Sequence, residues 1–215
     1  MIRKIKCYLA FTPFLYQLIL FILVPVALIV LQAAMAPRQT WSMAVGLNLT
    51  TALVLLEVEV FLDYWAFGAI CAREGMQMTY LRTSPRGIKL LKTALGVNLV
   101  RQFFAGLIPM LLGFVCRLQM GGGFEVEYAA RSMAYVLLGY IFLVTASTIA
   151  RFFDGLMLNL GIANIALITM MLVGIFMFLA PPILVILVPL AVLASIASVG
   201  IAVNRVKEGY YDRAD

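Results

Sequence analysis

The sequence predicts an all-α membrane protein with six transmembrane helices and both termini in the cytoplasm. The chain of 215 residues is 64% hydrophobic and 12% charged, with a mean hydropathy of +1.05, whereas a soluble domain is about 25% charged. Its apolar runs are longer than the roughly 18 residues that a helical span needs. They do not alternate between apolar and polar positions, as the strands of a membrane barrel do. We therefore expect one transmembrane domain over residues 1–215.

The first twelve residues interleave three basic side chains, Arg3, Lys4 and Lys6, with apolar ones. This pattern is typical of a short helix that lies at the membrane surface, and a plain basic flank that sets topology fits it equally well. The apolar run that follows is too long for a signal peptide and lacks a small-residue cleavage pattern before Pro37. We interpret it as a retained first span.

Six apolar blocks supply the expected spans, at about 14–35, 43–61, 94–114, 132–150, 156–179 and 183–203. The second span has an open alternative, a helical continuation to Ile70. The link between the last two spans contains Pro181 and Pro182. We interpret this link as a tight turn before a proline-kinked helix or as a short re-entrant segment, which would need shielding by protein.

The basic residues set the expected orientation. Of the 16 lysines and arginines, only Arg38, Arg117 and Arg131 fall in the loops between spans one and two and between spans three and four. The rest flank the opposite ends of the spans. Because cytoplasmic loops carry the excess of Lys and Arg, both termini are expected inside the cell, and the protein is expected in the cell membrane. The formal charge of +6 is thereby assigned to topology and not to nucleic-acid binding.

Several kinds of chemistry are missing from the sequence. There is no histidine, which excludes His-based catalysis and His metal sites in this chain. The three cysteines form no CxxC pair, which argues against a zinc site or a disulfide framework, and no GxxxxGK[ST] nucleotide motif occurs. We expect no enzymatic activity, no metal and no cofactor in the chain itself.

Three acidic residues, Glu57, Glu59 and Asp63, lie at the inner end of the second span. An ionisable group inside a span costs roughly 2.5–3.5 kcal/mol on insertion scales and suggests a function. Glu59 and Asp63 share a helix face because they are four residues apart, whereas Glu57 points largely the other way. Three interpretations remain open: a cation or proton site, a structural pair with Arg101 or with a neighbouring subunit, and acids in water beyond the bilayer.

Other polar or small residues sit in the later spans. Asn159 and Asn164 are interpreted as interhelical hydrogen-bond partners or as cavity lining, and with the three acids they make up a possible intramembrane polar site. The sixth span has a stripe of small residues that permits close helix approach, within the subunit or in a dimer: Ala191, Ala194, Ser195 and Ser198.

The longest polar interruption, residues 71–93, predicts an elbow of two helices. The first helix is expected from Cys71 to Leu81, and it is broken at Ser84–Pro85 because a residue before proline avoids the helical region. The second is expected to start with Ser84 as N-cap and Pro85 at its first position. The elbow would contact a hydrophobic groove of a partner or rest on anionic lipid, through an apolar set of Met76, Met78, Tyr80 and Leu81.

The elbow also resembles a known family. The run Arg73-Glu74-Gly75 followed by Thr79, Leu81 and Thr83-Ser84-Pro85 is similar to the segment between spans two and three of ABC-2-type exporter permeases. The chain departs from that pattern in two places. It lacks the second acidic residue often found beside Arg-Glu-Gly, and its link between spans five and six is short.

The resemblance implies a partner and a role for the elbow. Such permeases pair with a second copy or a related permease and with two copies of a separate ABC ATPase, which binds ATP and magnesium. The elbow would be the coupling helix, with Ser84 and Pro85 holding its angle. The contact with the ATPase would be formed by Arg73, Glu74, Met76, Met78, Tyr80, Leu81 and Arg82.

The expected function is therefore that of a permease subunit that moves an amphipathic or hydrophobic cargo, such as a membrane-active peptide, outward. Two alternatives stay open. One is a gradient-driven secondary carrier that uses Glu57, Glu59 and Asp63. The other is a non-transporting membrane scaffold or an enzyme of lipid metabolism, although the sequence offers no convincing pair of nucleophile and base.

Overall fold

The computed structural model describes five continuous stretches, residues 2–9, 55–67, 76–119, 126–151 and 181–211. It also describes positions 11, 15, 18, 19, 23, 24, 26, 27, 30, 161, 162, 164, 165, 168 and 169. Nearly all of these residues are helical, and no strand occurs among them. The predicted all-α class is confirmed for this part of the chain.

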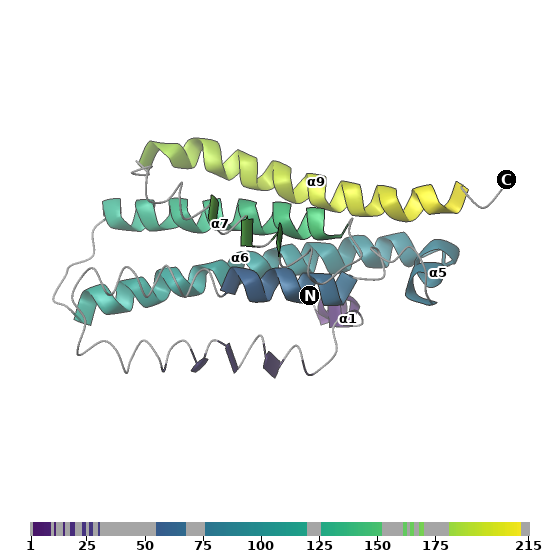
Figure 1. The fold of residues 1–215 in the computed structure, drawn as a ribbon, viewed down its shortest axis with the longest axis horizontal. Helices are drawn as coiled ribbons and strands as arrows, with labels where there is room; N and C mark the ends of the chain where they lie inside the picture. The colour runs from purple at the N-terminus through teal and green to yellow at the C-terminus, as the bar shows by residue number, and fades with distance from the viewer. Residues whose placement is uncertain are drawn as a thin grey trace.

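Three helices in the described part are long and apolar enough to cross a membrane. They lie side by side along the long axis of the molecule (Figure 1), and they are α6 (Gly87–Gln119), α7 (Val126–Ala150) and α9 (Leu184–Tyr211). They contain the predicted third, fourth and sixth spans. Each helix is longer than the span predicted for it, so that turns with polar residues extend beyond the apolar span.

The other predicted spans are described only in part. Residues 55–67 are helical, which confirms the helical end of the second span and its continuation beyond residue 61 to Phe67. The predicted spans 14–35 and 156–179 and the beginning of the second span lie mostly or wholly outside the described residues. So do the loop between spans one and two and residues 120–125 of the loop between spans three and four, whose other residues belong to α6 and α7. The count of six spans and the side of the termini therefore stay predictions.

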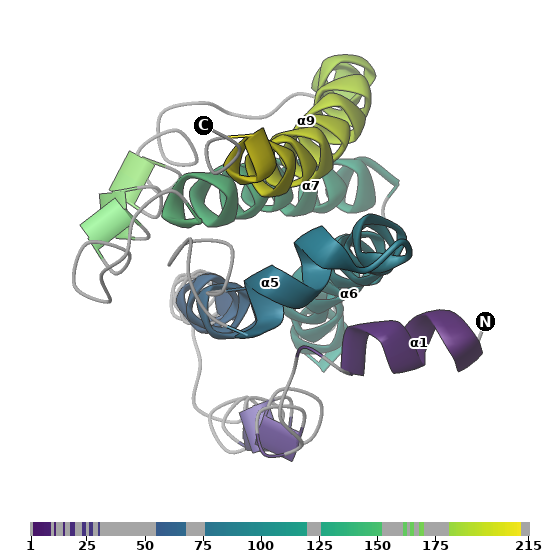
Figure 2. The same cartoon turned by 90° about the vertical axis from the view of Figure 1, so that its right-hand side faces the viewer.

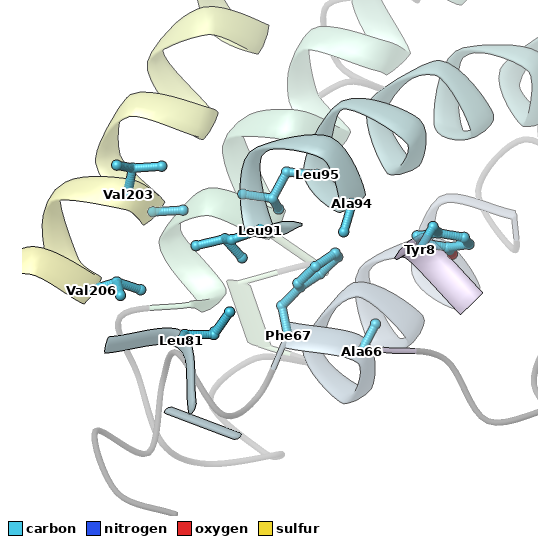
Figure 3. Close-up of a cluster of buried hydrophobic side chains, with 10 residues drawn as sticks. Tyr8, Ala66, Phe67, Leu81, Leu91, Ala94, Leu95, Val203 and Val206 are labelled. Carbon is cyan, nitrogen blue, oxygen red and sulfur yellow. The ribbon is translucent and has the colours of Figure 1, made fainter. Parts of the chain in front are cut away.

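The N-terminal helix α1 (Ile2–Leu9) runs crosswise to the long helices, as the end-on view shows (Figure 2). It packs against α6. Tyr8 is only 3% exposed and belongs to a buried cluster with Ala94 and Leu95 of α6 and with Phe67 (Figure 3). The predicted N-terminal helix is thus present, and its aromatic side is anchored in the protein core.

The stripe of small residues on α9 faces α7. Ala191 is buried beside Tyr140 and Val144 of α7, and the hydroxyl groups of Ser195 and Tyr140 lie 2.8 Å apart. Small side chains let the two helix backbones approach closely. Packing within the subunit, one of the two interpretations of this stripe, is therefore the observed one.

A short 3₁₀ turn, η3 (Pro181–Ile183), precedes α9, and Pro189 lies inside that helix. This arrangement fits the turn and proline-bearing helix expected at the end of the link. The residues just before Pro181 lie outside the described part, and so does any re-entrant segment there.

Candidate functional site

The predicted elbow is present between α5 (Met76–Thr83) and α6. The amide of Ser84 donates to the carbonyl of Tyr80 at 3.0 Å, and the amide of Gly87 donates to the carbonyl of Ser84 at 2.9 Å. The Ser84 Oγ accepts a weaker bond of 3.4 Å from the Arg86 amide. These bonds close a turn over residues 84–86, and the regular helix α6 begins directly after it, at Gly87. The bond from the Arg86 amide to the Ser84 Oγ fits the predicted N-cap role of Ser84, while Pro85 lies in the turn, two residues before α6.

Gly87 is required by the sharpness of this turn. A Cβ atom added there would lie 2.3 Å from the carbonyl oxygen of Leu81, which is far inside van der Waals contact. The end of α5 can therefore approach the start of α6 this closely only if the residue is glycine. Sequence reasoning missed Gly87, although a glycine soon after Ser-Pro in a turn is a signal for close backbone approach.

Leu81 holds the elbow to the rest of the chain. It is 1% exposed and packs in the same buried cluster as Leu91 of α6 and Val206 of α9 (Figure 3). Its predicted place in a partner contact is therefore wrong, because the side chain is already covered by the protein itself. The neighbouring Arg82 donates from Nε to the carbonyl of Val206 at 3.3 Å, which ties α5 to α9 as well.

Tyr80 is the predicted contact residue that the structure leaves exposed, at 55%. The basic side chains of Arg86 in the turn and of Lys89 and Lys92 in the first turns of α6 are exposed too. Arg73 and Glu74 lie outside the described residues, as do the side chains of Met76 and Met78. The elbow thus presents an aromatic ring and several positive charges on a rigid support.

A second polar site is buried where residues 55–67 pack against α6. Arg101 donates to both carboxylate oxygens of Glu59, at 2.6 Å from Nη1 to Oε1 and 2.5 Å from Nη2 to Oε2. Its Nη2 also donates to Asn98 Oδ1 at 3.0 Å, and Asn98 Nδ2 in turn donates to Asp63 at 2.7 Å. Two-point pairing of this kind is the strongest ordinary geometry between a guanidinium and a carboxylate.

Asp63 is the acceptor for a second guanidinium, that of Arg151 at the end of α7. Nε of Arg151 donates to Oδ2 at 2.8 Å, and Nη2 donates to Oδ1 at 2.6 Å. Its Nη1 reaches the hydroxyl of Ser198 on α9 at 3.1 Å, and Thr148 donates to the same hydroxyl at 2.7 Å. The network, as we call these linked side chains, therefore joins four helical segments.

The charges of the network balance, because its two carboxylates face two guanidinium groups. Burying an unpaired charge costs several kcal/mol, and close pairing with further hydrogen bonds offsets that cost. Glu59 is 2% exposed, Asp63 1% and Arg151 3%. The network is therefore shielded from water, and removal of one member would leave its partner as an uncompensated buried charge.

Comparisons of the chain with family models, with curated proteins and with solved structures found no match. Among the described residues there is also no cluster of three or more His, Cys, Asp or Glu side chains that could hold a metal ion.

The network bears on two of the three interpretations of the acids. The pair of Glu59 with Arg101 is the structural pairing that the sequence suggested, and the interpretation of acids in water is wrong for Glu59 and Asp63 because both are buried. Glu57 is half-buried and Asn164 is exposed, and neither joins the network. Asn159 lies outside the described residues.

Sequence reasoning missed four members of the network. It places Arg151 at a membrane flank, and it does not recognise the roles of Asn98, of Thr148, or of Ser198 as a bridge. A usable signal for Asn98 was its spacing, since it lies three residues before Arg101 and so on the same face of α6. For Arg151 no local pattern exists, because its partner Asp63 is brought to it only by helix packing.

Aromatic rings cover the network on the side of α1. The ring of Tyr8 lies with its centroid 5.8 Å from the guanidinium carbon of Arg101, a distance at which a cation is attracted to an aromatic face. Burial raises the pKa of Tyr8 to about 12, and the negative charges of Glu59 and Asp63 contribute to the rise, whereas the positive charge of Arg101 opposes it. Tyr8 is therefore neutral at physiological pH.

α6 thus carries the exposed elbow at its start and the buried network further along.

Proposed function

We propose that the chain is the permease subunit of an ATP-driven exporter of the ABC-2 type, which works as a dimer in the cell membrane with two separate ATPase subunits. The observation that carries the proposal is the elbow. A short helix is fixed rigidly to the start of the long apolar helix α6, and it presents the exposed ring of Tyr80. A partner protein that moves α6 would need such a rigidly attached helix with an exposed contact residue.

The length of α6 supports this role. Its 33 residues correspond to about 50 Å of helix at about 1.5 Å per residue, while the hydrocarbon core is about 30 Å thick. The excess lets the first turns, which carry the exposed Lys89 and Lys92, project from the membrane. A force applied to α5 would then be transmitted along one continuous helix.

Movement of the elbow would also reach other helices. Leu81 and Arg82 tie α5 to α9, and the network ties α6 to residues 55–67 and to the end of α7. A displacement of α5 would therefore be shared among the helices of the bundle. The cargo that suits such apolar helices is amphipathic or hydrophobic, such as a membrane-active peptide.

A gradient-driven carrier is the second candidate, since Glu59 and Asp63 are buried acids near a membrane span. The geometry favours it less. Each carboxylate already receives two hydrogen bonds from its own guanidinium group, which leaves no uncompensated negative charge for a transported cation. A carrier would have to break a buried ion pair in each cycle.

The test is to purify the chain from its native membrane, identify an ABC ATPase that accompanies it, and reconstitute the two purified proteins in vesicles. We expect ATP hydrolysis that increases when the permease is present, and Tyr80→Ala should reduce that increase. Leu118→Ala is the matched control, because Leu118 is a similarly exposed residue at the far end of α6. Transport that follows an ion gradient without ATP and is lost in Glu59→Gln would instead establish the carrier.

A further inference from the structure

The N-terminal segment forms part of a cover over both guanidinium groups of the network. Tyr8 lies on Arg101. The second guanidinium, that of Arg151, lies 5.3 Å from the ring centroid of Phe67. Phe11, just after α1, contacts Phe67 as well, with the two ring centroids 5.4 Å apart. One short segment thus helps to seal two buried charges that would otherwise be closer to water.

The described exposed charges of α1 are all basic. Lys4 and Lys6 are exposed, and α1 contains no acidic residue. The helix lies crosswise to α6, α7 and α9 (Figure 2). With those long helices along the membrane normal, α1 lies parallel to the membrane surface, as amphipathic surface helices do. Its lysines are then at the level of the lipid headgroups.

The attachment of α1 depends on its surroundings. An isolated helix of eight residues is not stable in water, so α1 needs contacts to remain folded and docked. On the protein side Tyr8, which is almost fully buried, supplies such a contact. The exposed charges of α1, on Lys4 and Lys6, are positive, which makes an anionic membrane surface the complementary partner.

We propose that α1 binds anionic phospholipid headgroups through Lys4 and Lys6, and that this binding keeps Tyr8 seated over the network. A lysine near an anionic membrane surface gains about fivefold in binding, so two lysines together favour the docked helix by about 25-fold. The composition of the lipid would thereby control how well the buried charges are sealed. This role does not depend on an ATPase and goes beyond the proposed transport function.

Cys7 offers a reporter for the docking of α1, because it lies in this helix and is half-buried. The full chain, with Cys71→Ser and Cys116→Ser, is placed in nanodiscs of phosphatidylcholine alone or of phosphatidylcholine with phosphatidylglycerol. The rate of Cys7 labelling by a water-soluble maleimide is then measured. We expect labelling about tenfold slower in the anionic nanodiscs, and high salt should remove the difference because it screens exposed charges.

Two pairs of variants make the test specific. Lys4→Gln with Lys6→Gln should label equally fast in both lipids. Lys89→Gln with Lys92→Gln removes the same charge from exposed positions on α6 and should keep the lipid difference. The proposal would be overturned if the parent protein were labelled equally fast in both lipids. It would also be overturned if the variant with Lys4→Gln and Lys6→Gln kept the lipid difference in labelling rate, or if the variant with Lys89→Gln and Lys92→Gln lost it.

A further variant tests the part played by Tyr8. Tyr8→Ala removes the ring that lies on Arg101 and should give fast labelling of Cys7 in both lipids. Slow labelling of this variant in the anionic nanodiscs would show that Tyr8 does not hold α1, and it would overturn that half of the proposal.

Discussion

Asp63 and Arg151 are 88 residues apart in the sequence and form a buried ion pair with two hydrogen bonds, of 2.6 Å and 2.8 Å. Both side chains are almost completely shielded from solvent. The pair joins the helical residues 55–67 to the end of α7, and through Ser198 it reaches α9. Its loss should therefore be felt in the stability of the whole bundle.

The first prediction concerns this pair. Asp63→Asn should lower the free energy of unfolding by about 3–5 kcal/mol, because Arg151 would be left as a buried charge without a counterion. Thermal unfolding in detergent measures the change. The control is Glu127→Gln, which breaks the exposed pair between Glu127 and Arg131 and should cost no more than about 0.5 kcal/mol. Similar effects of the two substitutions would contradict the assignment of Asp63 to a buried network.

The pair of Glu59 and Arg101 allows a comparison of single and double substitutions. Glu59→Leu alone should strongly destabilise the protein, because Arg101 loses both bonds to its carboxylate partner. Glu59→Leu combined with Arg101→Leu should be close to the parent or more stable, since two apolar side chains often replace a buried ion pair at no cost. A double variant as unstable as the sum of the two single variants would show that the residues do not interact.

Gly87 should be intolerant of any side chain. Gly87→Ala would place a Cβ atom against the carbonyl oxygen of Leu81, which should force the elbow apart and increase proteolytic cleavage near residues 84–86. Gly96→Ala is the matched control, because a Cβ atom at Gly96 meets nothing within 4 Å. In the interior of a helix that substitution should stabilise the protein by about 0.5–1 kcal/mol.

Two neighbouring residues of α5 should behave in opposite ways. Leu81→Ala should cost about 2–5 kcal/mol of stability, because it removes a buried side chain from the core. Tyr80→Ala should leave the unfolding temperature nearly unchanged, because Tyr80 is exposed. Circular dichroism melting of the two purified variants checks this, and a stable Leu81→Ala variant would contradict the observed anchoring of the elbow.

The pH dependence follows from Tyr8. Its pKa is raised from 10.0 to about 12 in the folded protein, so the folded state holds the proton more tightly than the unfolded state. The stability that burial of neutral Tyr8 contributes is complete below pH 10 and falls as the pH rises from about 10 to about 12. The difference in tyrosinate absorbance between the parent protein and Tyr8→Phe should titrate near pH 12. A midpoint near pH 10 would place Tyr8 in water.

Much of the helical framework could be predicted from local sequence. The apolar runs at 94–114 and 132–150 lie within α6 and α7, and the run at 183–203 lies within α9 except for its first residue, which ends the turn η3. Burial of backbone polar groups in an apolar environment leaves only a helix for such runs. The elbow was also predictable, since Ser84–Pro85 cannot continue a helix. Its exact turn was not, because the start of α6 depends on a bond between Ser84 and Gly87.

The sequence by itself determined that the apolar runs of α6, α7 and α9 are helical, that the chain bends at Ser84–Pro85, and that Glu59 and Asp63 share one face. It also pointed to Arg101 as a partner for an acid, since few cations lie near a span. Only the tertiary structure decided that Leu81 faces the core and Tyr80 faces outward, and that Arg151 reaches Asp63. The reason is physical: helix periodicity is local, whereas the neighbour that covers a side chain or balances a charge comes from a distant part of the chain.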